Sequence, residues 1–313
     1  MRHNSIQYDL LVAALPQQTN NNTAKAYKRA IKRFATWARD QGYHSVQEIR
    51  DAGSAGVIQA YEQALELQSQ SPATIHTHLA PICKGLEVSM RDISKPRRGA
   101  EALTRGRRGD NNSQGKREAL LPKYARLVAL QRAIGIRRAE LAHLTGADLV
   151  QDPAGEWCVL VRRGKGGKTQ LQRILPQHLD TVRQIMGSVD PDSRVFAPEE
   201  MANCIDLHSM RAALAKEAYD YYAARLAADP DYRQALRDDL TRRWRDGHGR
   251  FDMGLQFDSD LYNPTLYRLR GANRAAALKH GRPVTYDRVA MMAVSVYHLS
   301  HWRLDVTSVN YLT

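Results

Sequence analysis

The chain has 313 residues, which is about twice the length of an ordinary domain, so one large or two ordinary domains are expected. Its 46 Lys and Arg against 33 Asp and Glu give a formal charge of +13, which favours a polyanionic partner, nucleic acid ahead of an acidic membrane surface. No apolar run reaches the roughly 18 residues of a membrane span, so we expect no membrane partner. The apolar patch near the start is too short for a signal peptide, and the three scattered cysteines suit a reducing cytoplasm.

The first 95 residues are expected to form a small helical module. Apolar residues recur every three to four positions over 23–41, which predicts an amphipathic helix. A second helix is expected over 54–68 and a third from Ser71 and Pro72, because serine caps a helix and proline fits its first turn. Basic and short polar side chains on the first and third helices suit contacts with phosphates or base edges. The candidates are Lys28, Arg29, Thr74, His76 and Thr77.

Residues 96–116 are expected to be a basic linker. Glycine, asparagine and serine are scattered through this segment, and its apolar residues do not recur at regular spacing. A basic connector between two domains suits a clamp around a duplex, because each neutralised phosphate releases counterions. The candidate phosphate contacts of the connector are Arg97, Arg98, Arg105, Arg107 and Arg108.

The remaining residues, 117–313, are expected to form a second domain. It begins with helices, continues with strands at 157–161 and 171–175 around a Gly-rich turn, and returns to helix from Pro176 to the end. The turn sequence GKGGKT is similar to a phosphate-binding P-loop, but Arg162 stands where that motif requires its first glycine and a strand follows. No third and fourth ligands with recognisable spacing accompany the histidine and cysteine pairs of this domain, so no metal site is expected.

Four sequence motifs of this second domain, in their order along the chain, resemble those of the tyrosine recombinases, the integrase and site-specific recombinase family. AIGIRRAELAHL resembles the first arginine box, VRRGKGGKTQLQRILP the hairpin with its lysine, DLHSMR the His-x-x-Arg box and LSHWRLDVTSVNYL the closing box. TAKAYKRAIKRFATWA also resembles the core-binding domain of the family. The resemblance covers most of the chain and implies the following catalytic residues: Arg137, Lys165, His208, Arg211, His301, Trp302 and Tyr311.

In such a site Tyr311 would be the nucleophile that forms a 3′-phosphotyrosyl intermediate with DNA. Arg137 and Arg211 would bind the non-bridging phosphate oxygens, because guanidinium groups match phosphate and stay charged. His208 would be the base for the phenol, and Lys165 would protonate the departing 5′-oxygen. The resemblance implies no metal, no ATP and no other cofactor.

Two assignments within the motifs stay open. Lys168 is the alternative to Lys165 on the hairpin and is also a candidate DNA contact. Family members carry histidine or tryptophan ahead of the nucleophile, and both His301 and Trp302 fit that position. The residue at this position would hydrogen-bond the phosphate or pack against Tyr311.

The chain departs from compact family members in two ways. About ninety residues separate Arg211 from His301, and the excess, roughly 229–286, is expected to be a mostly helical insertion. Only two residues follow Tyr311, so a tail that packs on a neighbouring protomer is missing from this sequence. We therefore expect the insertion to control assembly.

The sequence as a whole predicts a mainly α fold with a small β-hairpin or sheet, in which a core-binding domain (1–95) and a linker (96–116) precede a catalytic domain (117–313). The implied function is site-specific DNA recombination by a dimer or tetramer on double-stranded DNA, in the cytoplasm at the nucleoid. Two alternatives remain open, a nicking and closing enzyme similar to type IB topoisomerases and an inactive DNA-binding homologue.

Overall fold

The structure is a computed structural model that describes residues 5–15, 21–98, 118–162, 164, 167, 169–247 and 254–312. The chain divides into two compact units, Met1–Arg105 and Gly106–Thr313, so the division falls within the segment expected to be a linker. The described residues are mainly helical with a small antiparallel sheet, which confirms the prediction of a mainly α fold with a small sheet. The described part of the chain has no helix that is both long and apolar enough to cross a bilayer.

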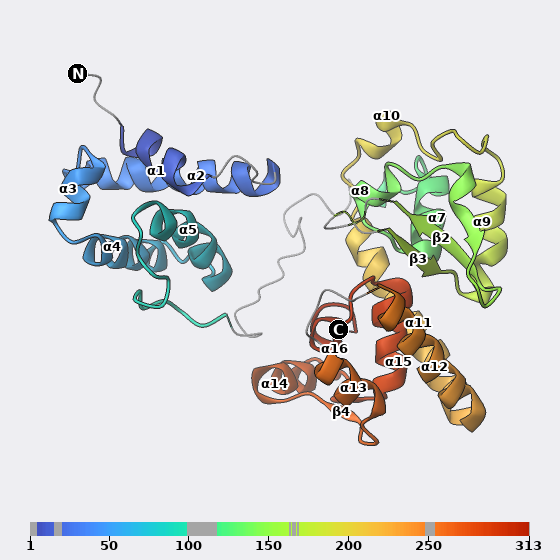
Figure 1. Cartoon of the computed structure of the whole chain (residues 1–313). Helices are drawn as coiled ribbons and strands as arrows, with labels where there is room; N and C mark the ends of the chain where they lie inside the picture. The colour runs from blue at the N-terminus through green and yellow to red at the C-terminus, as the bar shows by residue number, and fades with distance from the viewer. Residues whose placement is uncertain are drawn as a thin grey trace. The chain divides into compact units, whose positions relative to one another are not determined.

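The first unit is a helical module in which α1, α2 and α5 pack against one another (Figure 1). Its helices are α1 (Ile6–Ala14), α2 (Asn21–Asp40), α3 (Val46–Asp51), α4 (Ser54–Leu67) and α5 (Pro72–Gly85). The predicted amphipathic helix is α2, whose Ile31, Phe34 and Ala38 are buried in the core of the unit. α5 begins as predicted, because the Ser71 hydroxyl accepts a hydrogen bond from the backbone nitrogen of Thr74 at 3.2 Å. The helix α1 was not predicted.

The second unit contains a three-stranded antiparallel sheet in the order β1-β2-β3. The elements in this part are α7 (Ala125–Ile134), α8 (Arg138–Leu141), β1 (Leu149–Gln151), β2 (Trp157–Val161), β3 (Gln170–Arg173) and α9 (Leu179–Met186). β2 and β3 form the predicted hairpin, in which Val159 pairs with Gln172. The sequence did not predict β1, which extends the hairpin to three strands by pairing Val150 with Cys158. Short 3-10 turns lie at Gly146–Asp148 and Pro176–His178.

The rest of the second unit is mostly helical, and α13, α15 and α16 lie near the C-terminus (Figure 1). Its helices are α10 (Pro198–Met201), α11 (Leu207–Ala228), α12 (Pro230–Gly247), α13 (Gly254–Tyr262), α14 (Gly271–Lys279), α15 (Arg288–Ala293) and α16 (Leu304–Asn310). The prediction of uninterrupted helix after Pro176 was wrong at β4 (Tyr267–Arg268) and β5 (Thr285–Tyr286), which pair antiparallel. Such two-residue strands are too short for a period-2 signal in the sequence.

The segment 229–286, expected as an insertion, is part of the hydrophobic core of this unit. Leu240 and Leu261 are fully buried in the same cluster as Leu304 and Tyr311. Deleting the segment would therefore expose the core beneath the closing motif. Its expected role in assembly has to be tested by substitutions of exposed residues, since a deletion would not leave the rest of the unit intact.

Candidate active site

Five of the residues in the predicted catalytic set lie together, and Tyr311 is at their centre. The His208 ring meets the Tyr311 ring edge to face with centroids 5.6 Å apart, and the His301 ring lies 5.8 Å from it on another side. The guanidinium carbon of Arg211 is 5.7 Å from the centroid of the same ring. Tyr311 is 8% exposed, so these contacts surround a phenol that is almost buried. They bring together two segments that are far apart in the sequence, and Arg137 of a third segment lies beside Arg211.

Arg211 lies on the first turns of α11, and its side chain is 1% exposed. One guanidinium nitrogen donates to the carbonyl oxygen of Gly135, and the other donates to that of Leu299 at 2.7 Å. Burial, and next to it the charge of Arg137, lower the pKa of Arg211 below its ordinary value. Within the described part of the chain, Nε of Arg211 has no hydrogen-bond partner. The protein thus fixes a buried cation by two of its N–H donors and leaves others, Nε–H among them, for a further acceptor.

Arg137 is held at the start of α8 by Glu140. Its backbone nitrogen donates to one carboxylate oxygen of Glu140 at 2.8 Å, and its guanidinium donates to the other at 2.7 Å. Its second guanidinium nitrogen is 3.5 Å from the Leu299 oxygen that Arg211 also contacts. The neighbouring Arg138 instead donates to the carbonyl oxygen of Met201 at 2.9 Å. Of the two adjacent arginines, Arg137 is therefore the one that lies beside Arg211.

Two like charges that share one carbonyl acceptor repel each other, and a low-dielectric setting strengthens the repulsion. The cost is offset when an anion binds between them, because two guanidinium forks present planar donors that match phosphate oxygens. Groups whose charge is disfavoured by burial and by a like neighbour are typical of functional sites. The arginine pair is therefore an anion-binding arrangement.

Gly135 is required where α7 ends beside Arg211. It has a φ of +55°, a left-handed conformation that glycine adopts without strain. A Cβ at this position would lie 2.8 Å from Cδ2 of Leu214 and 3.4 Å from Cα of Arg211. The absence of a side chain thus lets α7 turn against α11 and aim the carbonyl of Gly135 at the guanidinium of Arg211.

His208 stands at the N-terminus of the long helix α11 and is exposed. The carboxylate of Asp206 caps the helix by accepting hydrogen bonds from the backbone nitrogens of His208 and Ser209, each at 3.1 Å. Helix N-termini carry a partial positive charge that favours anions. The Asp206 carboxylate offsets this partial charge, so the helix end serves to place His208 against Tyr311.

His301 is positioned by a π-helical turn, Val294–His298, that continues α15. Its backbone nitrogen donates to the carbonyl oxygen of Ser295 at 2.9 Å, and its Nδ1 lies 3.0 Å from the Ser295 hydroxyl. Burial, followed by the charges of Arg211 and Arg137, lowers the pKa of His301 to about 3. The ring is therefore neutral at neutral pH.

Trp302 has a different environment from its neighbour. Its indole packs edge to face against Trp244 of α12, with centroids 5.1 Å apart, and against Phe257 of α13 at 5.4 Å. Trp244 and Phe257 are themselves stacked at 4.6 Å. Of the two alternatives left open by the sequence, His301 lies against Tyr311, and Trp302 anchors the closing motif to the 229–286 segment.

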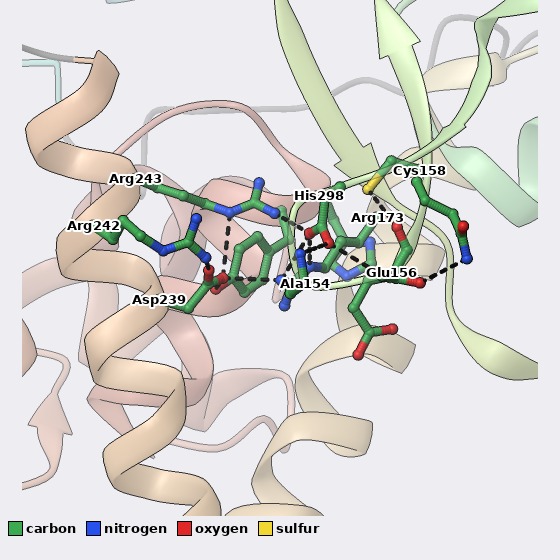
Figure 2. Close-up of polar contacts among 12 residues, drawn as sticks. Ala154, Glu156, Cys158, Arg173, Asp239, Arg242, Arg243 and His298 are labelled. Atoms are coloured by element: carbon green, nitrogen blue, oxygen red, sulfur yellow. Dashed lines mark hydrogen bonds and ion pairs between the residues drawn. The ribbon is translucent and has the colours of Figure 1, made fainter.

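An ionic network ties the 229–286 segment to the sheet, and no pattern in the sequence indicates it. Figure 2 shows Asp239 and Arg243 reaching from α12 toward Arg173 of β3. Arg173 donates to Asp152 at 2.8 Å and to Asp239 at 2.9 Å, and Arg243 contacts both carboxylates. The Tyr297 ring lies between the two arginines, with guanidinium carbons 4.0 and 4.6 Å from its centroid. Because Tyr297 belongs to the π-helical turn, the network fixes the segment that leads to His301.

The remaining predicted site residues fall into three groups. Exposed side chains available for contacts are those of Lys28, Arg29, Arg97 and Arg98. The polar groups of α5 already have partners, because Thr74 bonds Ser71, Thr77 bonds Ala73 and His76 bonds Pro96. Lys165, Lys168, Arg105, Arg107 and Arg108 lie outside the described residues.

Compared with known proteins, the chain matches no protein-family model and no curated sequence. Assignment of a function therefore rests on the residues and their geometry.

Proposed function

We propose that the protein is a tyrosine recombinase that cleaves and rejoins DNA through a 3′-phosphotyrosyl intermediate. The observation that carries the proposal is the convergence of Arg211, His208 and His301 on the buried phenol of Tyr311, with Arg137 beside Arg211 at the carbonyl oxygen of Leu299. These residues come from three distant motifs, each of which is common by itself. A backbone phosphate is the anion that this arrangement suits.

In this proposal Arg137 and Arg211 bind the non-bridging oxygens of the scissile phosphate. Attack on phosphorus builds further negative charge on these oxygens, and donors fixed in advance stabilise that charge most strongly in the transition state. The bonds of Arg211 to two backbone carbonyls and of Arg137 to Glu140 fix both guanidiniums before DNA arrives.

Tyr311 attacks the phosphorus through its phenolic oxygen, and the covalent bond conserves the energy of the phosphodiester for religation without ATP. A phenol is a weak nucleophile at neutral pH and needs a base or a positive field. His208 and His301 both lie against its ring and are the two candidates for the base. Lys165, with Lys168 as the alternative, is the proposed donor of a proton to the departing 5′-oxygen.

The partner in this proposal is double-stranded DNA, bound by a dimer or tetramer at the nucleoid. The net charge of +13 supports attraction to a polyanion. The first unit would act as the DNA clamp, with Lys28 and Arg29 as exposed cations on α2 and Arg97 and Arg98 following α5.

The first test is whether the protein becomes covalently attached to DNA. DNA that stays on the full chain through denaturation is recovered from expressing cells and sequenced, and a nicked duplex of that sequence then traps the adduct. We expect an adduct with the wild type and with Tyr221→Phe, and none with Tyr311→Phe, because only that change removes the proposed nucleophile.

Other outcomes separate the alternatives. Tight binding to the recovered DNA without an adduct in the wild type would identify an inactive homologue. Relaxation of supercoiled plasmid by a monomer, without a second site, would identify a nicking and closing enzyme.

Cleavage is expected to continue at an undiminished rate in excess EDTA. The arginine pair supplies the positive charge that a divalent ion supplies in metal-dependent phosphoryl transfer. The measurement is adduct formation on the nicked duplex with EDTA and with added Mg²⁺. Strict dependence on Mg²⁺ would contradict the proposed chemistry and favour a nuclease.

A further inference from the structure

The hydroxyl of Ser295 determines which nitrogen of His301 carries the proton. Ser295 is fully buried, and its oxygen contacts three groups: the carbonyl oxygen of His301, the backbone nitrogen of Arg303 at 3.0 Å and Nδ1 of His301 at 3.0 Å. A carbonyl oxygen only accepts and a backbone N–H only donates, so the single hydroxyl proton goes to the carbonyl of His301. The serine oxygen then accepts from Arg303 and from Nδ1, and Nδ1 must carry a proton.

The other ring nitrogen is left as a bare acceptor. A neutral imidazole has one proton, and with that proton on Nδ1 the Nε2 atom presents a lone pair. Nε2 is buried and, among the described residues, has no hydrogen-bond partner. Its ring faces Tyr311 at 5.8 Å between centroids, and tightening of this contact when DNA binds is common in catalytic sites.

We propose that His301, held by Ser295 as the Nδ1-protonated tautomer, is the base that takes the proton from Tyr311. This inference rests on the proposed function and makes Ser295 a positioning residue. As the Tyr311 oxygen bonds to phosphorus, its proton moves to Nε2 and the bond from phosphorus to the 5′-oxygen breaks, with Lys165 as the proposed proton donor to that oxygen. In religation the 5′-hydroxyl attacks, Lys165 regains its proton, and His301 returns its own proton to Tyr311.

The charged groups around His301 favour proton transfer from Tyr311 once a phosphate is bound. Arg211 on α11, Arg137 at the start of α8 and the adjoining Arg303 act on His301 as positive charges, and Asp305 acts on it as a negative charge. In the free protein the arginines disfavour protonation of His301. A bound phosphate neutralises part of their charge and so raises the proton affinity of Nε2 at the moment when a base is needed.

The assignment goes beyond the two roles expected for this position from the sequence, which were a hydrogen bond to the phosphate or packing against Tyr311. An Nε2 lone pair repels a phosphate oxygen, so the ring cannot donate there until it has taken the proton from Tyr311. Once protonated, the same Nε2 becomes a cationic donor beside the phosphate and stabilises the charge that attack creates.

The test begins with the wild-type chain without DNA, so its first result does not depend on activity. Nitrogen-15 labelling of histidine and long-range proton–nitrogen correlation spectra report which nitrogen is protonated, and loss of one signal set in His301→Gln gives the assignment. We expect an Nδ1-protonated, neutral His301 at pH 7. A ring protonated at Nε2 would overturn the proposal.

The second measurement is the rate of adduct formation on the nicked duplex. His301→Gln is expected to slow it about 10²-fold or more, as loss of a general base does. Ser295→Ala is expected to lose the fixed tautomer of His301 and to slow the reaction about 10-fold. This is the smallest effect in the usual range for loss of a residue that orients a histidine. Ser308→Ala, which also removes a buried serine hydroxyl, is the matched control and is expected to react like the wild type.

The outcomes distinguish this proposal from the one on which it rests. An adduct on Tyr311 that forms at the wild-type rate in His301→Gln overturns the base assignment and leaves the recombinase assignment standing. Partial recovery of a slow His301→Ala variant by free imidazole supports proton transfer over a structural role. Absence of any adduct in the wild type overturns both proposals, even when the tautomer is the expected one.

Discussion

Arg211→Lys and Arg137→Lys are each expected to slow formation of the covalent adduct by about 10²–10³-fold, the loss that follows removal of one donor to a developing oxyanion. Lysine keeps the charge, but its ammonium is a single point and cannot form the planar fork. At Arg211 the fork also spans two carbonyl oxygens, and lysine cannot reach both of these and a phosphate. Charge alone is therefore not expected to rescue the reaction.

Stability has to be measured beside the rate, because the two arginines differ in burial. Arg137 is partly exposed, so Arg137→Lys is expected to unfold at nearly the same denaturant concentration as the wild type. Arg211 is buried, and loss of a hydrogen bond to a charged group costs about 1.5–3 kcal/mol. Arg132→Lys, on the exposed side of α7, is the control for general DNA affinity. A wild-type rate in Arg137→Lys would contradict the proposed role of the pair.

Asp152→Asn is expected to lower the free energy of unfolding by about 3 kcal/mol, because it leaves two mostly buried guanidiniums short of a counter-charge. The Asp152 side chain is 1% exposed, and both Arg173 and Arg243 contact it. The measurement is urea unfolding at pH 7. Asp305→Asn breaks an exposed pair with Arg303 and is the control, with an expected loss of at most about 1 kcal/mol.

The wild type and Asp152→Asn should also differ in how their stability depends on pH in acid. Burial works to raise the pKa of Asp152, but the Arg173 guanidinium and hydrogen bonds to the carboxylate outweigh it and hold the pKa below its ordinary value. A carboxyl group of this kind contributes stability above its unfolded-state pKa and loses it as the pH falls through its lower folded-state pKa. The unfolding free energy of the wild type should therefore fall below about pH 4, and that of Asp152→Asn should fall less steeply. Equal slopes would contradict the network.

Local patterns in the sequence predicted those elements whose signal lies within a few neighbouring residues. The stripe along α2 and the capped start of α5 follow from spacing and residue type, and the strand β2 from its β-rich run. The motifs likewise marked Arg137, Arg211 and Tyr311, because each stands at a fixed offset in a short pattern. No pattern of this kind marks a two-residue strand such as β4.

The assignments that the sequence left open depend on the directions of side chains and on contacts between residues far apart in the sequence. His301 and Trp302 are adjacent, but they follow Ser300, which has a φ of +57°, and in extended backbone neighbouring side chains point to opposite sides. Only the fold shows that one meets Tyr311 and the other meets Trp244. Ser295 lies in a π-helical turn, a feature that often marks functional sites but that periodicity does not reveal.

The place of the 229–286 segment in the core could not be predicted for the same reason. Its mixed charge suggests a solvated surface, and the partners of Asp239 and Arg243 lie 66 and 91 positions away, on β3 and directly after β1. Distances of that kind are set by tertiary packing, so the sequence alone could not assign the segment to the core beneath Tyr311.

Mass spectrometry of the peptide that remains attached to DNA tests the central claim most directly. The full chain is denatured during cleavage of the nicked duplex, digested with protease and nuclease, and the residue that carries the nucleotide is identified. The expected result is a 3′-phosphate joined to the phenolic oxygen of Tyr311. A nucleotide on any other residue, or DNA that is cut without a protein-linked intermediate, would contradict the assignment.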